Sequence, residues 1–187
     1  APPAIVSVFL GEELTEILAK ISNDQPVEFK NKTFLKIGVD SLPELPKDNT
    51  DRNRTSPVAF TGNKFEFRMV ASSSSISDPN TVLNTIFADS LCDIADALEK
   101  ADDVTLESNK IVRDIFHDHS RIIFNGDNYS AEWIKEAEKR KLSNIKSTAE
   151  ALDSFVKPEV ISMFSKYEVF SEQELRSRYE IYMEQYI

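Results

Sequence analysis

Charged and apolar residues alternate without exception over positions 64–69. In chain order they are Lys64, Phe65, Glu66, Phe67, Arg68 and Met69. Since successive side chains of a β-strand point to opposite faces, this pattern predicts a strand over about residues 64–70 with its apolar face toward the core. An ordinary half-buried strand with a solvated charged face has this pattern. A strand whose Glu66 binds a metal or holds an anionic substrate in a cavity has the same pattern.

Apolar residues at helical spacing dominate the rest of the chain. A first helix is expected over residues 4–21, and a second begins at Asp78-Pro79, a typical helix start. The expected core stripe of the second helix consists of Val82, Ile86, Phe87, Leu91, Ile94 and Leu98. Further helices are expected over residues 103–117, 130–141, 148–155 and 172–186, the last two begun by capping boxes at Ser147 and Ser171.

Strands are expected only in the first 75 residues. Two short extended segments lie near 27–29 and 34–39, and a long polar loop covers 40–56. This distribution predicts the α+β class, mainly helical with a small antiparallel sheet in residues 1–75. We expect one unit in two parts, residues 1–75 with a helix and the strands, and residues 76–187 as a helical C-terminal region.

Composition limits the class of protein. The 187 residues are 41% apolar, enough for one sizeable core, and the net charge of −10 argues against nucleic acid or an anionic membrane surface as partner. The single cysteine, Cys92, excludes an intramolecular disulfide and is expected to be buried. No apolar run of membrane-spanning length and no signal peptide is present, so a cytoplasmic location is expected.

Three stretches resemble one enzyme family. They are Asn-Arg-Thr-Ser-Pro-Val-Ala-Phe-Thr-Gly-Asn-Lys-Phe-Glu-Phe-Arg at 53–68, Ala-Pro-Pro-Ala-Ile-Val-Ser-Val-Phe-Leu-Gly at 1–11, and Ile-Ile-Phe-Asn-Gly-Asp-Asn-Tyr-Ser-Ala-Glu-Trp at 122–133. All three resemble blocks of the large type III glutamine synthetases, and the central block is long enough to be specific. The resemblance covers nearly the whole chain. It implies an incomplete part of that family's catalytic domain, most of which is expected upstream of Ala1.

The resemblance also implies roles for individual residues. Glu66 is a ligand of Mg²⁺ or Mn²⁺, both of which favour carboxylate oxygens. Arg68 helps bind glutamate or its acyl phosphate, and Arg54 contacts the nucleotide phosphate and the transition state. Lys64 is assigned to ATP binding, although better-known bacterial enzymes have an arginine there, and a lysine lacks the planar guanidinium fork. Those enzymes also carry a second arginine at the position of Ala59. The resemblance implies that both differences are features of the type III subtype, and it leaves the exact phosphate contacts open.

Other candidate residues favour structural roles. His117 and His119 alternate at a helix end, which favours interaction with the helix dipole over a metal site. Trp133 is expected in the core or at a subunit contact. The same is expected of the stripe formed by Tyr179, Tyr182 and Tyr186.

The resulting interpretation is a C-terminal fragment of an ATP-dependent ligase that forms glutamine from glutamate and ammonia through γ-glutamyl phosphate. The fragment supplies one metal carboxylate and part of the arginine set, and is expected to be inactive alone. The resemblance implies a homo-oligomer, a dodecamer for the full-length family. The alternative is a non-catalytic helical interaction module related to the enzyme, in which the Glu66 strand is empty and exposed to solvent.

Overall fold

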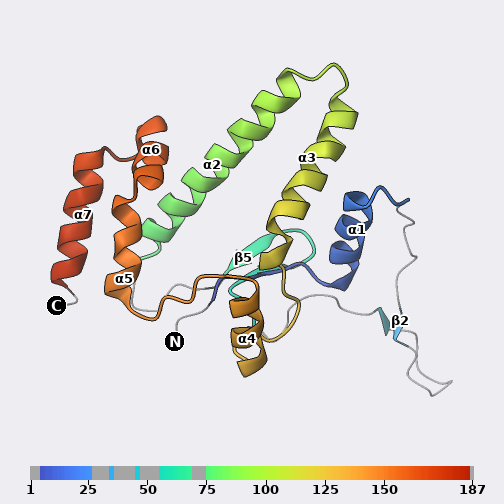
Figure 1. Ribbon diagram of the computed structural model, residues 1–187, viewed down its shortest axis with the longest axis horizontal. Helices are drawn as coiled ribbons and strands as arrows, with labels where there is room; N and C mark the ends of the chain where they lie inside the picture. Colours follow the sequence, from blue (N-terminus) through green and yellow to red (C-terminus); the bar gives the residue numbers. More distant parts are fainter. Residues whose placement is uncertain (1–4, 27–33, 36–44, 47–54, 69–74, 186–187) are drawn as a thin grey trace. The chain divides into compact units, whose positions relative to one another are not determined.

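The computed structural model describes residues 5–26, 34–35, 45–46, 55–68 and 75–185 (Figure 1). The strands are β1 (Val8–Phe9), β2 (Phe34–Leu35), β3 (Leu45–Pro46), β4 (Val58–Phe60) and β5 (Phe65–Phe67). The helices are α1 (Glu12–Ser22), α2 (Ser77–Glu99), α3 (Val104–His119), α4 (Ala131–Lys139), α5 (Thr148–Leu152), α6 (Pro158–Lys166) and α7 (Glu172–Glu184). Short 3-10 helices follow α3 and α5, at Ser120–Ile122 and Asp153–Val156. The α+β class, mainly helical with a small sheet in the first part of the chain, is confirmed.

The chain folds into two compact units, each built from segments that are distant in sequence. One unit contains α2 and the helices α5, α6 and α7. The other contains all the strands together with α1, α3 and α4. The expected division of the chain into residues 1–75 and 76–187 stays a prediction.

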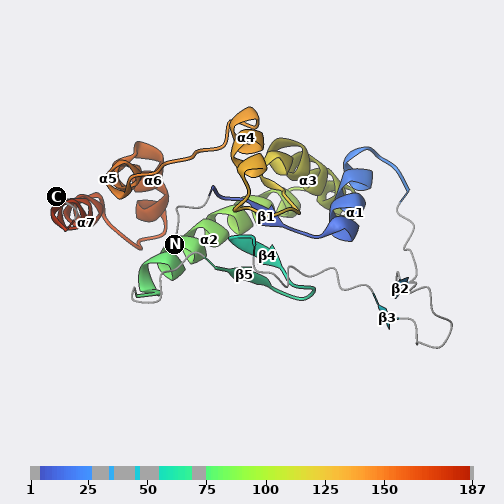
Figure 2. The same ribbon diagram turned by 90° about the horizontal axis from the view of Figure 1, so that it is seen from below.

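The main sheet has the strand order β1-β4-β5 (Figure 2). β4 pairs antiparallel with β5, but β1 pairs parallel with β4, and Val8 also forms a parallel bridge with Ile123. The sheet is therefore mixed, and the prediction of a purely antiparallel sheet is wrong. A second, antiparallel pair joins β2 to β3. The extended segment expected near 27–29 and most of the polar loop lie outside the described residues.

β1 occupies residues that were expected to be helical. The predicted helix over 4–21 begins only at Glu12, because Gly11 adopts φ 80°, a left-handed conformation that interrupts a right-handed helix. The residues before Gly11 instead join the sheet, where Phe124 N–H donates to the Val8 carbonyl at 3.0 Å. Tertiary pairing therefore overrides the apolar periodicity in this segment.

Trp133 forms the centre of the core in the strand-containing unit. Its ring is fully buried and stacks on Phe124, with ring centroids 4.2 Å apart. Ser130 caps α4 by accepting from the Trp133 N–H at 3.1 Å, as its position predicted. Gly126 is required beside this stack, because a Cβ there would lie 2.6 Å from the Phe124 ring. The core alternative expected for Trp133 is confirmed.

The helical unit is held together by apolar packing and by aspartates of α2. Leu152, Phe164 and Leu175 are buried on α5, α6 and α7. Asp89 of α2 accepts from Lys166 Nζ at 2.9 Å and from the Tyr167 hydroxyl at 3.0 Å. Asp78 at the start of α2 accepts from the Tyr182 hydroxyl, and Asp153 from the Tyr179 hydroxyl. Tyr186, the third tyrosine of the expected stripe, lies outside the described residues.

The capping sequences correctly predicted the start of α7, but not the caps and starts of α5 and α6. Ser171 and Glu174 form the predicted capping box with both reciprocal bonds. Ser147 begins α5 without any side-chain cap bond, so the capping box expected there is wrong. α6 was not expected, although Pro158 at its first position is a recognisable start signal.

The apolar stripe of α2 was expected in the core and is instead largely exposed. Ile86, Phe87 and Leu91 are exposed, and Thr85 is the buried residue of this helix. Cys92 is exposed too, so the prediction of a buried thiol is wrong. Asp89 and Asp78 of α2 bond to Lys166 and Tyr182, and Val82, Ile94 and Leu98 of the stripe are half-buried. Within the described part of the chain, none of the helices is long and apolar enough to cross a membrane.

Leu175 provides a test of the helical core. Leu175→Ala removes a side chain with 0% exposure and leaves a cavity, so we expect the free energy of unfolding to fall by about 2–5 kcal/mol. Ile181→Ala on the exposed side of α7 is the matched control and should change it by no more than about 0.5 kcal/mol. Urea denaturation of the chain measures both values. Equal effects of the two substitutions would contradict the assignment of Leu175 to the core.

Candidate functional site

The charged side of β5 carries a short network centred on Glu66. Arg68 donates from Nε at 3.1 Å and from Nη2 at 3.0 Å, both to the same carboxylate oxygen, Oε2. The other oxygen, Oε1, faces the Lys64 ammonium at 3.5 Å. Glu66 therefore has one oxygen engaged by a guanidinium and one oxygen in a looser ion pair. This confirms that the three charged residues share one side of the strand.

Exposure differs across the three charged residues. The side chain of Arg68 is only 15% exposed, that of Glu66 is 36% exposed, and that of Lys64 extends further into solvent. The hydrogen bond from Arg68, reinforced by the charges of Arg68 and Lys64, holds the pKa of Glu66 below its ordinary value. Glu66 is thus kept ionised, the state in which a carboxylate binds a cation.

The apolar side of β5 is not buried. Phe65 is 53% exposed and Phe67 is also exposed, so the prediction that these rings face the core is wrong. The Phe65 ring lies beside that of Phe60 on the neighbouring strand, with ring centroids 5.2 Å apart. β5 lies at the edge of the sheet, and no other described element covers this face. The alternation correctly predicted a strand, but burial depends on which element lies over each face.

A metal would need further ligands besides Glu66. Its Oε1 is a hard oxygen donor of the kind that Mg²⁺ and Mn²⁺ prefer, so the residue fits the role of one ligand. In the described part of the chain, however, no three residues of the types His, Cys, Asp and Glu are grouped to hold an ion. His117 and His119 lie in the last turn of α3, as expected from their spacing, and His117 Nδ1 lies 3.0 Å from Asp118.

Arg54 lies outside the described residues, but the segment that follows it is well held. Ser56 and Pro57 are buried, and Pro57 leads directly into β4. The Pro57 carbonyl accepts from the Arg68 N–H at 2.8 Å, and Ala59 stands opposite Glu66 in the ladder. Pro57, at the start of β4, and the Glu66–Arg68 pair are therefore adjacent parts of one hairpin. Ala59 itself is fully buried.

Two asparagines in the loop before α4 were not singled out from the sequence. The Asn125 Oδ1 accepts from the N–H groups of Leu10 and Gly11, and its Nδ2 donates to Thr15. Asn128 makes separate contacts with the segment that precedes β4. Bonds over more than one hundred residues of sequence separation leave no local signal.

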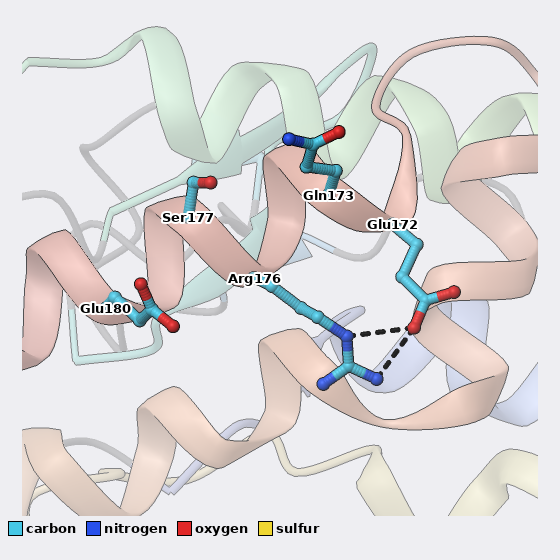
Figure 3. A pocket seen from close by; sticks show the side chains of 5 residues that line it. All are labelled: Glu172, Gln173, Arg176, Ser177 and Glu180. Atoms are coloured by element: carbon cyan, nitrogen blue, oxygen red, sulfur yellow. Dashed lines mark hydrogen bonds and ion pairs between the residues drawn. The ribbon is translucent and has the colours of Figure 1, made fainter.

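An open depression of about 490 Å³ lies along one side of α7 (Figure 3). It is lined by Glu172, Gln173, Arg176, Ser177 and Glu180. Arg176 donates from Nε to Glu172 at 2.8 Å, so its charge is already neutralised within the helix. None of the candidate site residues lines this depression.

Comparisons with known proteins identify one family throughout. The family model described as glutamine synthetase C-terminal domain matches residues 107–187. The whole chain aligns at 45% identity with type-3 glutamine synthetase of Dictyostelium discoideum, covering 26% of that protein. It aligns at 36% identity with glutamine synthetase of Bacteroides fragilis and at 34% with that of Butyrivibrio fibrisolvens, covering 26% and 27% of their lengths. The chain thus spans about a quarter of the length of these relatives.

The electrostatic state of Glu66 can be tested by titration. We expect Arg68→Ala to raise the pKa of Glu66 back toward its ordinary value, because the strongest stabilisation of its charged form is lost. Since the folded pKa is lowered, the pair stabilises the fold above the unfolded pKa, and this contribution disappears as the pH falls through the folded pKa. NMR titration of the carboxyl carbon measures the change.

Arg140→Ala is the matched control for this titration. Arg140 holds the pKa of Glu136 down by the same kind of hydrogen bond, at 2.7 Å. The control should therefore raise the pKa of Glu136 and leave that of Glu66 unchanged. An unaltered Glu66 pKa in Arg68→Ala would refute the pairing.

Proposed function

Since the chain belongs to the glutamine synthetase family, we propose that it is part of an ATP-dependent ligase that joins ammonia to glutamate to form glutamine. The observation that carries the proposal is the ionised Glu66 between Arg68 and Lys64, on one side of a strand that belongs to the aligned region. Two cations and one carboxylate suit a site that handles anionic substrates and a divalent ion. The reaction proceeds through γ-glutamyl phosphate.

In this proposal Glu66 of β5 and the flanking residues Lys64 and Arg68 have separate roles. Glu66 supplies one ligand to Mg²⁺ or Mn²⁺, and the ion offsets negative charge on the transferring phosphoryl group. Arg68 binds the carboxylate or acyl-phosphate end of glutamate, which suits its guanidinium fork. Lys64, the most exposed of the three, contributes a mobile positive charge toward ATP. Arg54 contacts the nucleotide phosphate.

We further propose that the chain does not catalyse the reaction alone. The chain corresponds to about a quarter of its relatives, and its described residues contribute a single carboxylate to the proposed metal site. The remaining ligands are then supplied from elsewhere in the full-length protein. The proposal includes a homo-oligomer, a dodecamer as in the full-length family, and a cytoplasmic location. Size-exclusion chromatography with light scattering and cell fractionation test these two statements.

A second candidate function is a non-catalytic helical interaction module. The observation that favours it is the exposure of β5, whose two phenylalanines and Lys64 extend into solvent. The ionised Glu66 paired with Arg68 favours the ligase, because an interaction strand does not require this arrangement. An activity assay on the full-length protein distinguishes the two functions.

We expect the isolated chain to form no glutamine from glutamate, ammonia and ATP, and to bind Mn²⁺ only weakly, because one carboxylate is too few for a tight site. A coupled assay for ADP release and an Mn²⁺ titration followed by electron paramagnetic resonance measure the two properties. The full-length protein under identical conditions is the positive control. Turnover by the chain at the rate of the full-length protein would overturn the proposal that it is an incomplete part.

In the full-length protein, Glu66→Ala should lower kcat by about 100- to 1,000-fold, the range typical of removing one group that stabilises transition-state charge. Arg68→Ala should lower kcat or raise the KM for glutamate, and Arg54→Ala should affect phosphoryl transfer most. Steady-state kinetics at saturating metal measure these effects. Glu136→Ala, which breaks a similar arginine pair on α4, is the matched control and should retain the wild-type kcat. Wild-type kinetics for Glu66→Ala would show that the site is assigned to the wrong residue.

A further inference from the structure

A buried polar contact joins the loop before α4 to the segment that leads into β4. Asn128 is 5% exposed, and its side-chain Nδ2 donates to the Ser7 hydroxyl at 2.6 Å. Its backbone N–H donates to the Thr55 carbonyl at 3.1 Å. Burying an amide is unfavourable unless it is hydrogen-bonded, so these bonds restrict where Asn128 can sit. One residue thus links the start of β1 to the start of β4.

The contact continues from Thr55 to the charged side of β5. Pro57, two residues after Thr55, has a fixed φ and presents its carbonyl to the Arg68 N–H at 2.8 Å. The residue before a proline is restricted to extended conformations, so the short segment between Thr55 and Pro57 has little freedom. A shift of Thr55 is therefore passed on to Pro57, and from Pro57 to the backbone of Arg68.

The position of the Arg68 backbone decides the geometry of the Glu66 pair. Both hydrogen bonds from Arg68 reach one oxygen of Glu66, at 3.0 and 3.1 Å, and the arginine side chain is mostly buried. A mostly buried side chain has few alternative rotamers with which to compensate for a shift of its backbone. A displaced Arg68 backbone therefore changes the distances from its guanidinium to Glu66. The orientation of Oε1, the oxygen available to a cation, depends on the same pair.

We propose that Asn128 is a positioning residue for the Glu66–Arg68 pair, acting through Ser7, Thr55 and Pro57. The inference rests on the proposed ligase function and adds a residue that does not itself touch substrate or metal. Asn128 comes from a loop more than fifty positions beyond β5 in the chain, and its contribution consists of holding the hairpin that carries the charged residues.

Asn125 in the same loop offers a matched control. Its side chain is equally well bonded, to the N–H groups of Leu10 and Gly11 and to Thr15, but these contacts hold the start of α1. Asn125→Ala therefore removes a comparable set of loop bonds without touching the segment between Thr55 and Pro57. A merely structural role for both asparagines predicts equal consequences for activity.

The experiment compares Asn128→Ala, Ser7→Ala and Asn125→Ala in the full-length protein. We expect Asn128→Ala to lower kcat and to raise the Mn²⁺ concentration at half-maximal rate, with a combined effect of about 10- to 100-fold, as for groups that orient a metal ligand. Mn²⁺ binding, followed by electron paramagnetic resonance without turnover, should weaken in parallel. Ser7→Ala, which deletes only the hydroxyl that accepts from Asn128, should shift both readings in the same direction by a smaller factor.

The matched control, Asn125→Ala, should lower the melting temperature and leave the dependence of the rate on Mn²⁺ concentration unchanged. If Asn128→Ala does not fold, Ser7→Ala carries the comparison, because it removes a single oxygen atom. The positioning role would be overturned if the Ser7→Ala and Asn128→Ala variants are active and keep the wild-type Mn²⁺ dependence. It would also be overturned if Asn125→Ala alters the Mn²⁺ dependence as much as Asn128→Ala does. A wild-type full-length protein that forms no glutamine would instead overturn the proposed function, and this inference with it.

Discussion

Buried amide hydrogen bonds from the loop between Phe124 and Asn128 hold the strand-containing unit together. Ile123, just before this loop, forms a parallel bridge with Val8 of β1, and the Phe124 N–H donates to the Val8 carbonyl. The two asparagines of the loop bond to the segments that precede α1 and β4. The buried ring of Trp133 stacks on Phe124 in the same unit, and the buried bond from Asn128 to Ser7 is costly to lose in such surroundings. Segments separated by more than one hundred residues thus form a single scaffold behind β5.

This scaffold presents charge at the edge of the sheet rather than in its centre. Glu66 stays ionised because Arg68 donates to it and Lys64 lies nearby, while the buried Ala59 stands opposite it in the ladder. An edge strand has one set of backbone groups that no described strand pairs with, and an open face on which Phe65 and Phe67 lie. A longer polypeptide of the glutamine synthetase family has most of its length available to cover such a strand, since the chain corresponds to about a quarter of its relatives.

The helical unit is held together partly by side-chain hydrogen bonds to two aspartates of α2. α2 meets its neighbours through Asp78 and Asp89, whose bonds to Tyr182, Lys166 and Tyr167 align helices that are far apart in sequence. The hydrogen bonds from Lys166 and Tyr167 hold the pKa of Asp89 below its ordinary value, so this contact is intact at neutral pH and is lost only in acid. Ile86, Phe87 and Leu91 of the α2 stripe are exposed, which shows that amphipathic periodicity identifies a helix without telling which face is buried.

The sequence by itself determined the features that depend on neighbouring residues. Alternation predicted β5 and the shared side of Lys64, Glu66 and Arg68, and the capping box predicted the start of α7, because both patterns act within a few residues. The motifs also identified the family. Only the tertiary structure decided that the residues before Gly11 form a parallel strand, that Phe65 is exposed, and that Asn128 bonds to Ser7 and Thr55. These features depend on residues that are distant in the chain. Contacts between distant residues produce no periodic pattern in the local sequence.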